Sequence, residues 1–389
     1  MLREVAIVTV GRSDYGIYRP LLKRLARAPQ VKLRLFAGGT HSSSFHGNTI
    51  HELQTENLAD VEAVEMLLAS DSPEAVAKSV GLGVCSFAQA FARVRPHILV
   101  VLGDRFEMFS AAAAALPMLL PVAHIHGGER TAGAIDDSLR HAITKLSHLH
   151  FVSTLEHRQR VLQLGEEDWR VTVSGAPALD ALLHEPRLPL EAVETQFDLD
   201  LSRPYLLATF HPVTLEPGDA SRQVVALLHG LSSARLPVVF TMPNADSGSS
   251  GIRRQVTEFL ESHPESAAIE SFGARAYATV LAHAAALVGN SSSGILEAPS
   301  LGTPVVNIGS RQNGRARARN VIDVEAEPEA VADAVARALS AEFRDSLVGL
   351  KNPYGDGQAA EKIASVLLEI PLDARLIQKQ FVDAGSARE

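Results

Sequence analysis

The residues best suited to chemistry in this sequence lie between positions 124 and 145, in the stretch HIHGGERTAGAIDDSLRHAITK. Three histidines, three carboxylates and two arginines surround a pair of glycines there. Such groups can bind a metal ion, transfer protons, or pair along a solvated helix. The last possibility is favoured by polar residues spaced four apart, which are Asp136 with Arg140, Asp137 with His141, and His141 with Lys145.

A metal site is the least favoured of these interpretations. His124 and His126 alternate on a predicted strand, so both side chains are expected on one face, but no third ligand follows at metal-binding spacing. We therefore expect no metal ion and no cofactor. A charge-paired helix alone does not explain the three histidines or Glu129, which comes directly after Gly-Gly, so acid–base chemistry remains as the functional alternative.

Polar residues also follow other predicted strands. They occur in GRSDYG (11–16), GDRFE (103–107), FHPVT (210–214) and GNSSSGILE (289–297). Open parallel sheets build their ligand sites from the residues at the carboxyl ends of their strands. For Asp104 alone, a turn that caps a helix is an equally good interpretation.

The segment GNSSSGILEAP is the best candidate for anion binding. Serines before an apolar helix place hydroxyls and free backbone N–H groups at the positive end of a helix dipole. Plain capping by Ser292 or Ser293 is the alternative, and Glu297 could either cap a helix or accept hydrogen bonds from a ribose diol. The spacing matches neither a Walker loop nor G-x-G-x-x-G. Arg12, Arg311 and Arg315 could hold a phosphate or lie in solvated loops.

The elements that must position these residues are apolar strands alternating with helices, a pattern typical of parallel sheets covered on both faces. We expect an α/β fold of two doubly wound Rossmann-like domains, with the active site in the cleft between them. The first domain is predicted at 1–180, a linker at 181–204 and a nucleotide-binding domain at 205–356. The helix near 357–370 is expected to pack back on the first domain. The predicted strands are 5–10, 31–38, 97–104, 121–128, 148–153, 170–177, 205–212, 237–244, 267–273, 285–292 and 303–310.

Composition narrows the class of protein. The chain of 389 residues has a formal net charge of -9 and no strongly basic segment, which disfavours nucleic-acid and anionic-membrane partners. Its single cysteine, Cys85, fits a reducing compartment. The N-terminus lacks a signal-peptide pattern and no continuous apolar run of membrane-spanning length occurs, so a cytoplasmic location is expected.

Taken together, seven motifs resemble a known family. GRSDYG, GDRFE, HIHGGERTAGAIDDSLRHAITKLSHLHF, FHPVT, PNAD, GNSSSGILEAP and NIGSRQNGR are similar to those of the hydrolysing UDP-N-acetylglucosamine 2-epimerases of bacterial sialic and legionaminic acid pathways. The resemblance implies a glycosyltransferase-B-type fold and a homodimer or homotetramer. It also implies a reaction that splits a UDP-linked 2-acetamido sugar and inverts C2, releasing UDP and a sugar of the N-acetylmannosamine type.

The resemblance also implies roles for individual residues. Asp104, Glu129, Asp137 and His211 match functional positions of the family and are the candidate catalytic residues. The candidate substrate-binding residues are Arg12, Asp14, His126, Arg140, Asn244, Ser291, Ser292, Ser293, Gly294, Glu297, Arg311 and Arg315.

Two positions depart from the family. Many relatives carry a lysine where this chain has Ile17, a loss for which Arg19 could compensate, and some non-bacterial relatives carry glutamate in place of His126. The departures favour a substrate other than plain UDP-N-acetylglucosamine, and they leave Glu129, Asp137 and His126 as alternatives for the group that moves the C2 proton. A non-hydrolysing epimerase, a glycosyltransferase of the same fold and a non-catalytic nucleotide-sugar sensor are the other functions considered.

Overall fold

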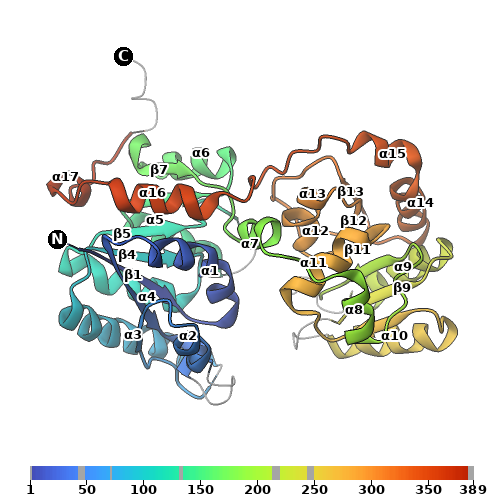
Figure 1. Ribbon diagram of the computed structural model, residues 1–389, viewed down its shortest axis with the longest axis horizontal. Helices are drawn as coiled ribbons and strands as arrows, with labels where there is room; N and C mark the ends of the chain where they lie inside the picture. The colour runs from blue at the N-terminus through green and yellow to red at the C-terminus, as the bar shows by residue number, and fades with distance from the viewer. Residues whose placement is uncertain are drawn as a thin grey trace. The chain divides into compact units, whose positions relative to one another are not determined.

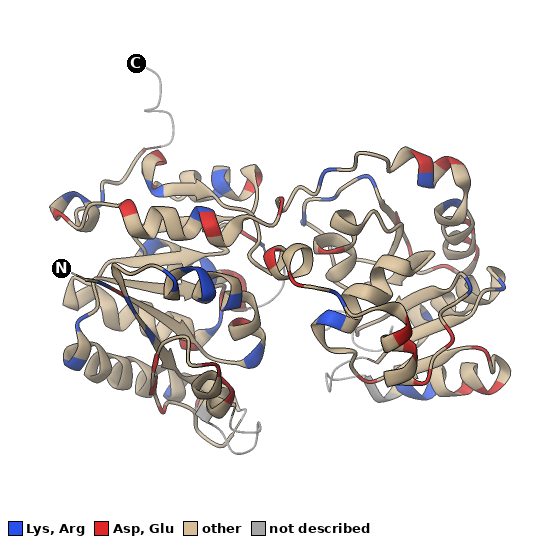
Figure 2. Cartoon of the chain, viewed as in Figure 1, with Lys and Arg blue, Asp and Glu red and all other residues tan. Residues whose placement is uncertain are grey.

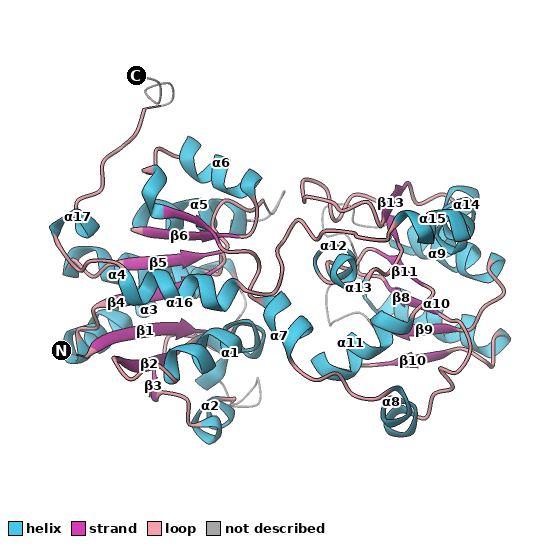
Figure 3. Ribbon diagram, turned by 45° about the horizontal axis from the view of Figure 1, so that its top comes forward, coloured by secondary structure: helices cyan, strands magenta, loops and turns pink. Residues whose placement is uncertain are grey.

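The computed structural model describes residues 2–42, 49–70, 72–130, 135–212, 220–242 and 249–383. The chain divides into two compact units, the first formed by Met1–Ala181 with Tyr354–Glu389 and the second by Leu182–Pro353. Each unit is a parallel sheet with helices on both faces (Figures 1 and 3), which confirms the predicted two-domain α/β fold. Basic and acidic residues are interspersed over both units (Figure 2).

The first sheet has seven parallel strands in the order β3-β2-β1-β4-β5-β6-β7. Its strand order reverses between β1 and β4, where Val5 of β1 aligns with Leu33 on one side and with Ile98 on the other. Such a reversal is the point at which doubly wound sheets bind ligands. The strands are β1 (Arg3–Thr9), β2 (Val31–Ala37), β3 (Asp60–Ala63), β4 (Ile98–Leu102), β5 (Val122–Ile125), β6 (Leu149–Val152) and β7 (Val171–Val173).

The helices of the first unit cover both faces of this sheet. Helix α4 packs against α3 and α5, whereas α1 packs against a helix from the end of the chain. The late helix α16 packs beside α1 (Figure 1), where Arg24 forms two hydrogen bonds to Glu361, of 2.5 and 3.0 Å. The helices are α1 (Arg12–Ala26), α2 (Ile50–Glu56), α3 (Pro73–Val94), α4 (Phe106–Ala115), α5 (Ile135–Leu146), α6 (Leu155–Gln163), α7 (Ala178–His184, at the boundary of the units), α16 (Ala359–Glu369) and α17 (Ala374–Ile377).

The second sheet has six parallel strands in the order β10-β9-β8-β11-β12-β13, with its reversal between β8 and β11. One hydrophobic cluster lies against α9, α10 and α14, and a second lies against α8, α11 and α13. The strands are β8 (Leu206–Thr209), β9 (Val238–Thr241), β10 (Ala267–Ile269), β11 (Ala286–Gly289), β12 (Val305–Ile308) and β13 (Val321–Val324). The helices are α8 (Leu190–Phe197), α9 (Ala220–Ser233), α10 (Ser249–Ser262), α11 (Gly273–His283), α12 (Ser293–Leu296), α13 (Ala298–Leu301), α14 (Pro328–Leu339) and α15 (Ala341–Ser346).

The structure differs from the sequence-based expectation at two edge strands and one segment. β3 and β13 were not predicted, because edge strands tolerate polar residues such as Glu62 and Asp323 and so lack a continuous apolar run. Residues 181–204, expected as a linker, contain α8, and Val193 and Leu201 are buried in the core of the second unit. This segment is therefore mostly part of the second unit.

One helix of the described chain, α3, is long and apolar enough to cross a membrane by length and composition alone. Its 18-residue window has a mean hydropathy of 1.3, and 33% of that window is buried. Phe87 and Phe91 on its inner face pack into the core of the first unit, where the ring of Phe91 lies 5.2 Å from that of Phe36. The apolar character of α3 therefore has a packing explanation on this face.

Candidate active site

The carboxyl end of β1 leads into a polar corner of the first unit. Asp14, in the first turn of α1, is 8% exposed, and its Oδ2 atom has no hydrogen-bond partner in the described residues. Burial raises the pKa of Asp14 to about 6, although the nearby Arg105 guanidinium acts in the opposite direction. Arg105 itself forms two hydrogen bonds, of 2.8 and 3.2 Å, to the buried Glu107. Arg12 is exposed and lies 3.3 Å from Glu52 of α2.

The ends of β4 and β5 are joined by one arginine. Arg140 of α5 is buried and forms an ion pair with Asp104, which follows β4. Its Nη1 atom lies 4.0 Å from Oε2 of Glu129 and donates a 2.9 Å hydrogen bond to the backbone carbonyl of His126. Arg140 thus connects the segments that follow β4 and β5. It contacts Asp104, His126 and Glu129, and all four residues were predicted from the sequence.

A second set of contacts links His126 to Glu129. Nδ1 of His126 lies 2.5 Å from Oε1 of Glu129 and 3.0 Å from the hydroxyl of Ser153, which follows β6. The same hydroxyl donates a 2.8 Å hydrogen bond to Oε1 of Glu129. His157, buried behind this group, has its Nδ1 atom 3.9 Å from the same carboxylate oxygen. Burial alone would raise the pKa of Glu129, but the charge and hydrogen bond of His126 and the charge of Arg140 outweigh it and hold that pKa well below its ordinary range.

His124 and His126 differ in role, although the alternation of a strand predicted that they share a face. His126 lies just beyond β5 with φ 66°, a left-handed conformation that turns its ring away from the strand pattern. His124 is fully buried, with Nε2 2.7 Å from the carbonyl of Gly103 and Nδ1 3.2 Å from the hydroxyl of Thr144. Burial lowers the pKa of His124 to about 3, so this residue is a neutral core histidine.

Helix α5 keeps one of its three expected pairs. His141 Nε2 lies 3.6 Å from Asp137 Oδ2. The ion pairs of Arg140 are instead tertiary, and Lys145 lies 2.5 Å from Glu166, which follows α6, and not beside His141. Asp136 was not selected from the sequence, yet burial and then the charge of Asp104 raise its pKa, which places this carboxyl in the electrostatic field of the site.

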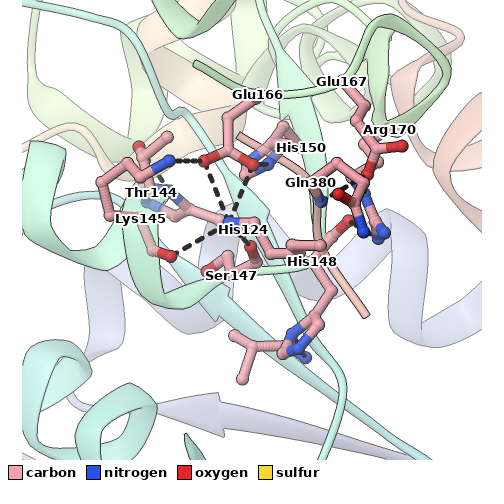
Figure 4. A network of polar contacts seen from close by, with 12 residues as sticks. His124, Thr144, Lys145, Ser147, His148, His150, Glu166, Glu167, Arg170 and Gln380 are labelled. Carbon is pink, nitrogen blue, oxygen red and sulfur yellow. Dashed lines mark hydrogen bonds and ion pairs between the residues drawn. The ribbon is translucent and has the colours of Figure 1, made fainter. Parts of the chain in front are cut away.

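A buried polar network holds the C-terminal end of α5 (Figure 4). Glu166 accepts hydrogen bonds from Lys145 at 2.5 Å, His150 at 3.0 Å and Lys379 at 2.9 Å. Lys379 also donates to the backbone carbonyl of Ser147 at 2.6 Å, so the end of the chain is tied to the end of α5. This network is structural, and His150 is fully buried within it.

In the second unit, the carboxyl ends of β8 and β11 are clamped together by Asn290. The amide of this buried residue accepts a 2.8 Å hydrogen bond from the backbone N–H of His211 and donates one of 2.8 Å to its carbonyl. Gly289 precedes it with φ 138°, and a Cβ there would overlap the backbone of Thr209. Asn290 therefore fixes the backbone of His211, a role that sequence reasoning missed although the residue lies in the GNSSSG motif.

The serines after β11 form a hydroxyl cluster at the start of α12. The hydroxyl of Ser293 lies 2.5 Å from that of Tyr277 and 3.2 Å from that of Ser291. Ser291 accepts a hydrogen bond from the backbone N–H of Ser293 at 3.3 Å, whereas Ser292 makes no side-chain cap. Close packing explains the glycine at position 294, since a Cβ there would lie only 2.9 Å from Cγ1 of Val305.

Glu297 follows these serines and has an unusual environment. It makes no side-chain cap to α13, which removes the capping alternative. Burial raises the pKa of its carboxyl to about 7. The phenol of Tyr277 lies close enough for the charge on Glu297 to raise its pKa, in addition to the effect of burial.

The hydroxyls of Ser291, Ser293 and Tyr277 line a cavity of ≈ 350 Å³ in the second unit. The lining combines hydroxyls, one imidazole and one carboxylate with two aromatic rings, which suits a ligand with both polar and planar parts. The lining residues include Thr209, His211, Phe272, Tyr277, Ser291 and Ser293.

The remaining predicted residues lie apart from this cavity or outside the described chain. Arg311 is exposed, and its Nη1 atom donates to the carbonyl of Asn290 at 3.1 Å. Arg315 is partly buried, and its Nη1 atom has no partner in the described residues. Asn244, with the rest of the PNAD motif, lies outside the described residues. The described chain contains no group of three or more histidines, cysteines or carboxylates arranged to hold a metal ion.

Four residues near the site were missed by sequence reasoning, and two of them could have been found from the rule that polar residues follow the strands. Ser153 directly follows a predicted strand, as do the other polar residues of the site. Asn290 lies within a motif already selected. Asp136 was assigned to a helical charge pair, and no pattern in the sequence indicates that Asp136 or His157 lies near the acids of the site.

Comparison with known proteins identifies the family of the chain. Residues 23–368 match the family model of UDP-N-acetylglucosamine 2-epimerase, and the chain belongs to this family. It is 34% identical to UDP-N,N'-diacetylbacillosamine 2-epimerase (hydrolyzing) of Legionella pneumophila, over 97% of this chain and 99% of that one. It is 35% identical to GDP/UDP-N,N'-diacetylbacillosamine 2-epimerase (hydrolyzing) of Campylobacter jejuni, over 98% and 99% of the two chains. The structure of UDP-GlcNAc 2-epimerase from Neisseria meningitidis bound to UDP-GlcNAc shares the fold, with a TM-score of 0.79 at 19% identity over 94% of this chain and 100% of that one.

Proposed function

We propose that the protein is a hydrolysing 2-epimerase that converts a UDP-linked 2-acetamido sugar to UDP and the free sugar inverted at C2. The observation that carries the proposal is the group formed by Asp104, His126, Glu129 and Arg140 at the carboxyl ends of β4 and β5. It combines carboxylates, which can stabilise a developing cation, with an imidazole, which can transfer a proton, and Arg140 contacts all three residues within hydrogen-bond or ion-pair distance. Full-length similarity to two hydrolysing relatives supports the same reaction.

The chemistry follows from the substrate class. The hydrogen on C2 is not next to a ketone, so its direct removal would be very costly. Breaking the bond between C1 and the diphosphate first creates an oxocarbenium-like centre, and loss of the C2 proton then gives a glycal. Water adds to C1 while a proton returns to C2 from the opposite face. Asp104 and Asp137 provide carboxylates for the cation and for this second proton transfer.

The second unit is proposed to bind the nucleotide. The cavity beside Phe272 suits the base, Glu297 suits the ribose hydroxyls, and the hydroxyls at the start of α12 suit the phosphates. His211 lines the same cavity and provides a donor for the leaving diphosphate. Arg12, Arg311 and Arg315 are proposed phosphate ligands, as is Asn244 a ligand of the substrate.

For the sugar, we propose either UDP-N-acetylglucosamine or UDP-2,4-diacetamido-trideoxyglucose. The relatives of Legionella and Campylobacter are named for diacetylbacillosamine, which favours the second, and Ile17 in place of the lysine of many relatives agrees with an altered substrate. The product would serve nonulosonic acid synthesis in the cytoplasm, which is consistent with a single cysteine.

The decisive experiment is incubation of the protein with each nucleotide sugar in D2O, followed by NMR of the products. We expect release of UDP and a free sugar with deuterium at C2. Release of UDP-N-acetylmannosamine would instead identify a non-hydrolysing epimerase, and turnover only with an acceptor would identify a glycosyltransferase. Tight UDP binding without turnover would identify a sensor, and UDP release without deuterium at C2 would exclude epimerisation.

A homo-oligomer is also proposed, either a dimer or a tetramer. The outer face of α3 exposes small and apolar residues, among them Leu82, which is 45% exposed, and Cys85. A second copy of the chain would remove this surface from water. Light scattering after gel filtration should give a multiple of the monomer mass, and Leu82→Glu should lower it. A monomeric unaltered protein would contradict the proposal.

A further inference from the structure

The two acid–base groups after β5, Glu129 and His126, differ in how the protein engages their polar atoms. Oε1 of Glu129 receives the hydroxyl of Ser153 at 2.8 Å and Nδ1 of His126 at 2.5 Å, with His157 at 3.9 Å. Its other oxygen faces Arg140 at 4.0 Å. The hydrogen bonds from Ser153 and His126 and the charge of Arg140 stabilise the ionised form of this carboxylate, which is therefore a weak base.

The same contacts determine which tautomer the neutral ring of His126 adopts. A carboxylate only accepts hydrogen bonds, and the Ser153 hydroxyl already donates to it, so the hydrogen between His126 and Glu129 belongs to Nδ1. In the neutral ring, Nε2 is then the unprotonated nitrogen. Nε2 forms no hydrogen bond to the described residues, and the side chains of His126 and Glu129 are 14% and 19% exposed. The basic nitrogen is therefore the one left for a ligand.

The backbone of His126 is also held in place. Its φ of 66° is an uncommon, strained conformation for a residue other than glycine, so it persists only where surrounding contacts enforce it. The 2.9 Å hydrogen bond from Arg140 to the carbonyl of His126 is one such contact. Ring and backbone are thus both fixed by residues that belong to the acid–base group.

From this geometry we infer that His126 is the base that takes the C2 proton, and that Glu129 is a positioning residue which fixes the tautomer and orientation of the imidazole. The inference rests on the proposed function and exchanges the roles predicted from the sequence for these two residues. In the step, the C1–O bond breaks and its electron pair leaves on the diphosphate oxygen. The C2–H bond breaks, its electron pair forms the C1–C2 double bond, and the proton binds Nε2.

The first test uses His126→Asn, whose amide N–H can replace Nδ1–H toward Glu129 but offers nothing in place of Nε2. We expect kcat to fall by about 10²- to 10⁴-fold with KM changed less than about threefold, and C2 deuterium incorporation to fall equally. His283→Asn is the matched control, because this exposed histidine of α11 also uses Nδ1, toward the Thr279 carbonyl at 2.8 Å. It should leave both constants unchanged. Normal turnover by His126→Asn would overturn the inference.

The second test uses His126→Gly, which suits the left-handed backbone and leaves space for an added imidazole. We expect imidazole to restore turnover, and to restore it at least tenfold less well when Glu129→Gln is added, because the ring then loses its orienting carboxylate. Glu129→Gln alone should reduce kcat by roughly 10- to 100-fold. Complete loss of C2 exchange in Glu129→Gln, with exchange kept in His126→Asn, would make Glu129 the base and refute the inference.

Two controls separate the possible failures. UDP binding by calorimetry and the circular dichroism spectrum show whether each variant folds; if His126→Gly does not, the comparison of His126→Asn with Glu129→Gln still decides between the two bases. If the unaltered protein releases no UDP, the proposed function itself fails. If the unaltered protein turns over, but Glu129→Gln loses C2 exchange and His126→Asn keeps it, only the assignment of the base fails.

Discussion

Glu297→Gln tests the reasoning about the nucleotide site most directly, because the side chain keeps its shape and loses its charge. The pKa of Glu297 is raised by burial from 4.5 to about 7. At about 1.4 kcal/mol per pKa unit, this shift corresponds to at most about 3 kcal/mol. Because the residue retains some contact with solvent, the measured value should be smaller, roughly 1 to 3 kcal/mol.

The pH dependence of this contribution to stability follows from the raised pKa of Glu297. Above the ordinary pKa of 4.5 the unfolded chain ionises at this residue, while the folded protein keeps the carboxyl protonated until the pH approaches 7. The contribution of Glu297 to stability is therefore fully present below pH 4.5 and is lost as the pH rises to 7. Urea unfolding should show the glutamine variant to be more stable than the unaltered protein at pH 8 and equally stable at pH 4. A difference that does not vary with pH would refute the reasoning.

Glu297→Gln should weaken UDP binding, although it stabilises the folded protein at pH 8. Ribose hydroxyls that donate to the Glu297 carboxylate would stabilise its charged form, so UDP binding near pH 7 should release protons. Calorimetry in two buffers of different ionisation enthalpy measures this release. Glu297→Gln should abolish it and weaken UDP binding roughly 10-fold or more, as expected for loss of a hydrogen bond to a charged group. Unchanged affinity and unchanged proton release would exclude Glu297 from the ribose site.

Three further changes have defined outcomes. Asp104→Asn should lower kcat by about 10²-fold or more with UDP binding retained, as measured by steady-state kinetics and calorimetry, and a normal kcat would exclude a role in the chemistry. Asn290→Ala should release the backbone of His211 and lower kcat/KM by roughly 10-fold or more at a stability cost of about 1 to 3 kcal/mol, whereas a stability loss without a kinetic effect would make it purely structural. Lys379→Met should destabilise the protein to urea by roughly 3 to 5 kcal/mol, because Glu166 then loses a buried charge partner, and a change below about 0.5 kcal/mol would contradict that view.

The central strands were predictable because both faces of each sheet are covered, so a strand such as β4 appears as an unbroken apolar run. Edge strands lack that requirement, and β3 was missed for this reason. The segment around α8 was misjudged because its prolines and acids dominate its composition. Its few apolar residues, such as Val193, nevertheless reach the core.

For the site, the strand-end rule found Asp104, Glu129 and His211, because it depends only on chain direction and sheet topology. It did not predict that His126 and Glu129 touch. That contact depends on the left-handed backbone of His126, which a residue other than glycine does not reveal in a sequence. Local spacing also predicted a pair between Asp136 and Arg140, but a buried arginine is better stabilised by the carboxylates after β4 and β5.

The division of the chain has a consequence for how the protein is made. The first unit needs α16 beside α1 and Lys379 beside Glu166, yet both partners are encoded after the whole second unit. The ribosome synthesises the chain from its N-terminus, so the first unit stays incomplete while residues 182–353 are synthesised. The second unit is continuous and is able to fold during that interval. During synthesis, the unit that begins first is thus the one that is completed last.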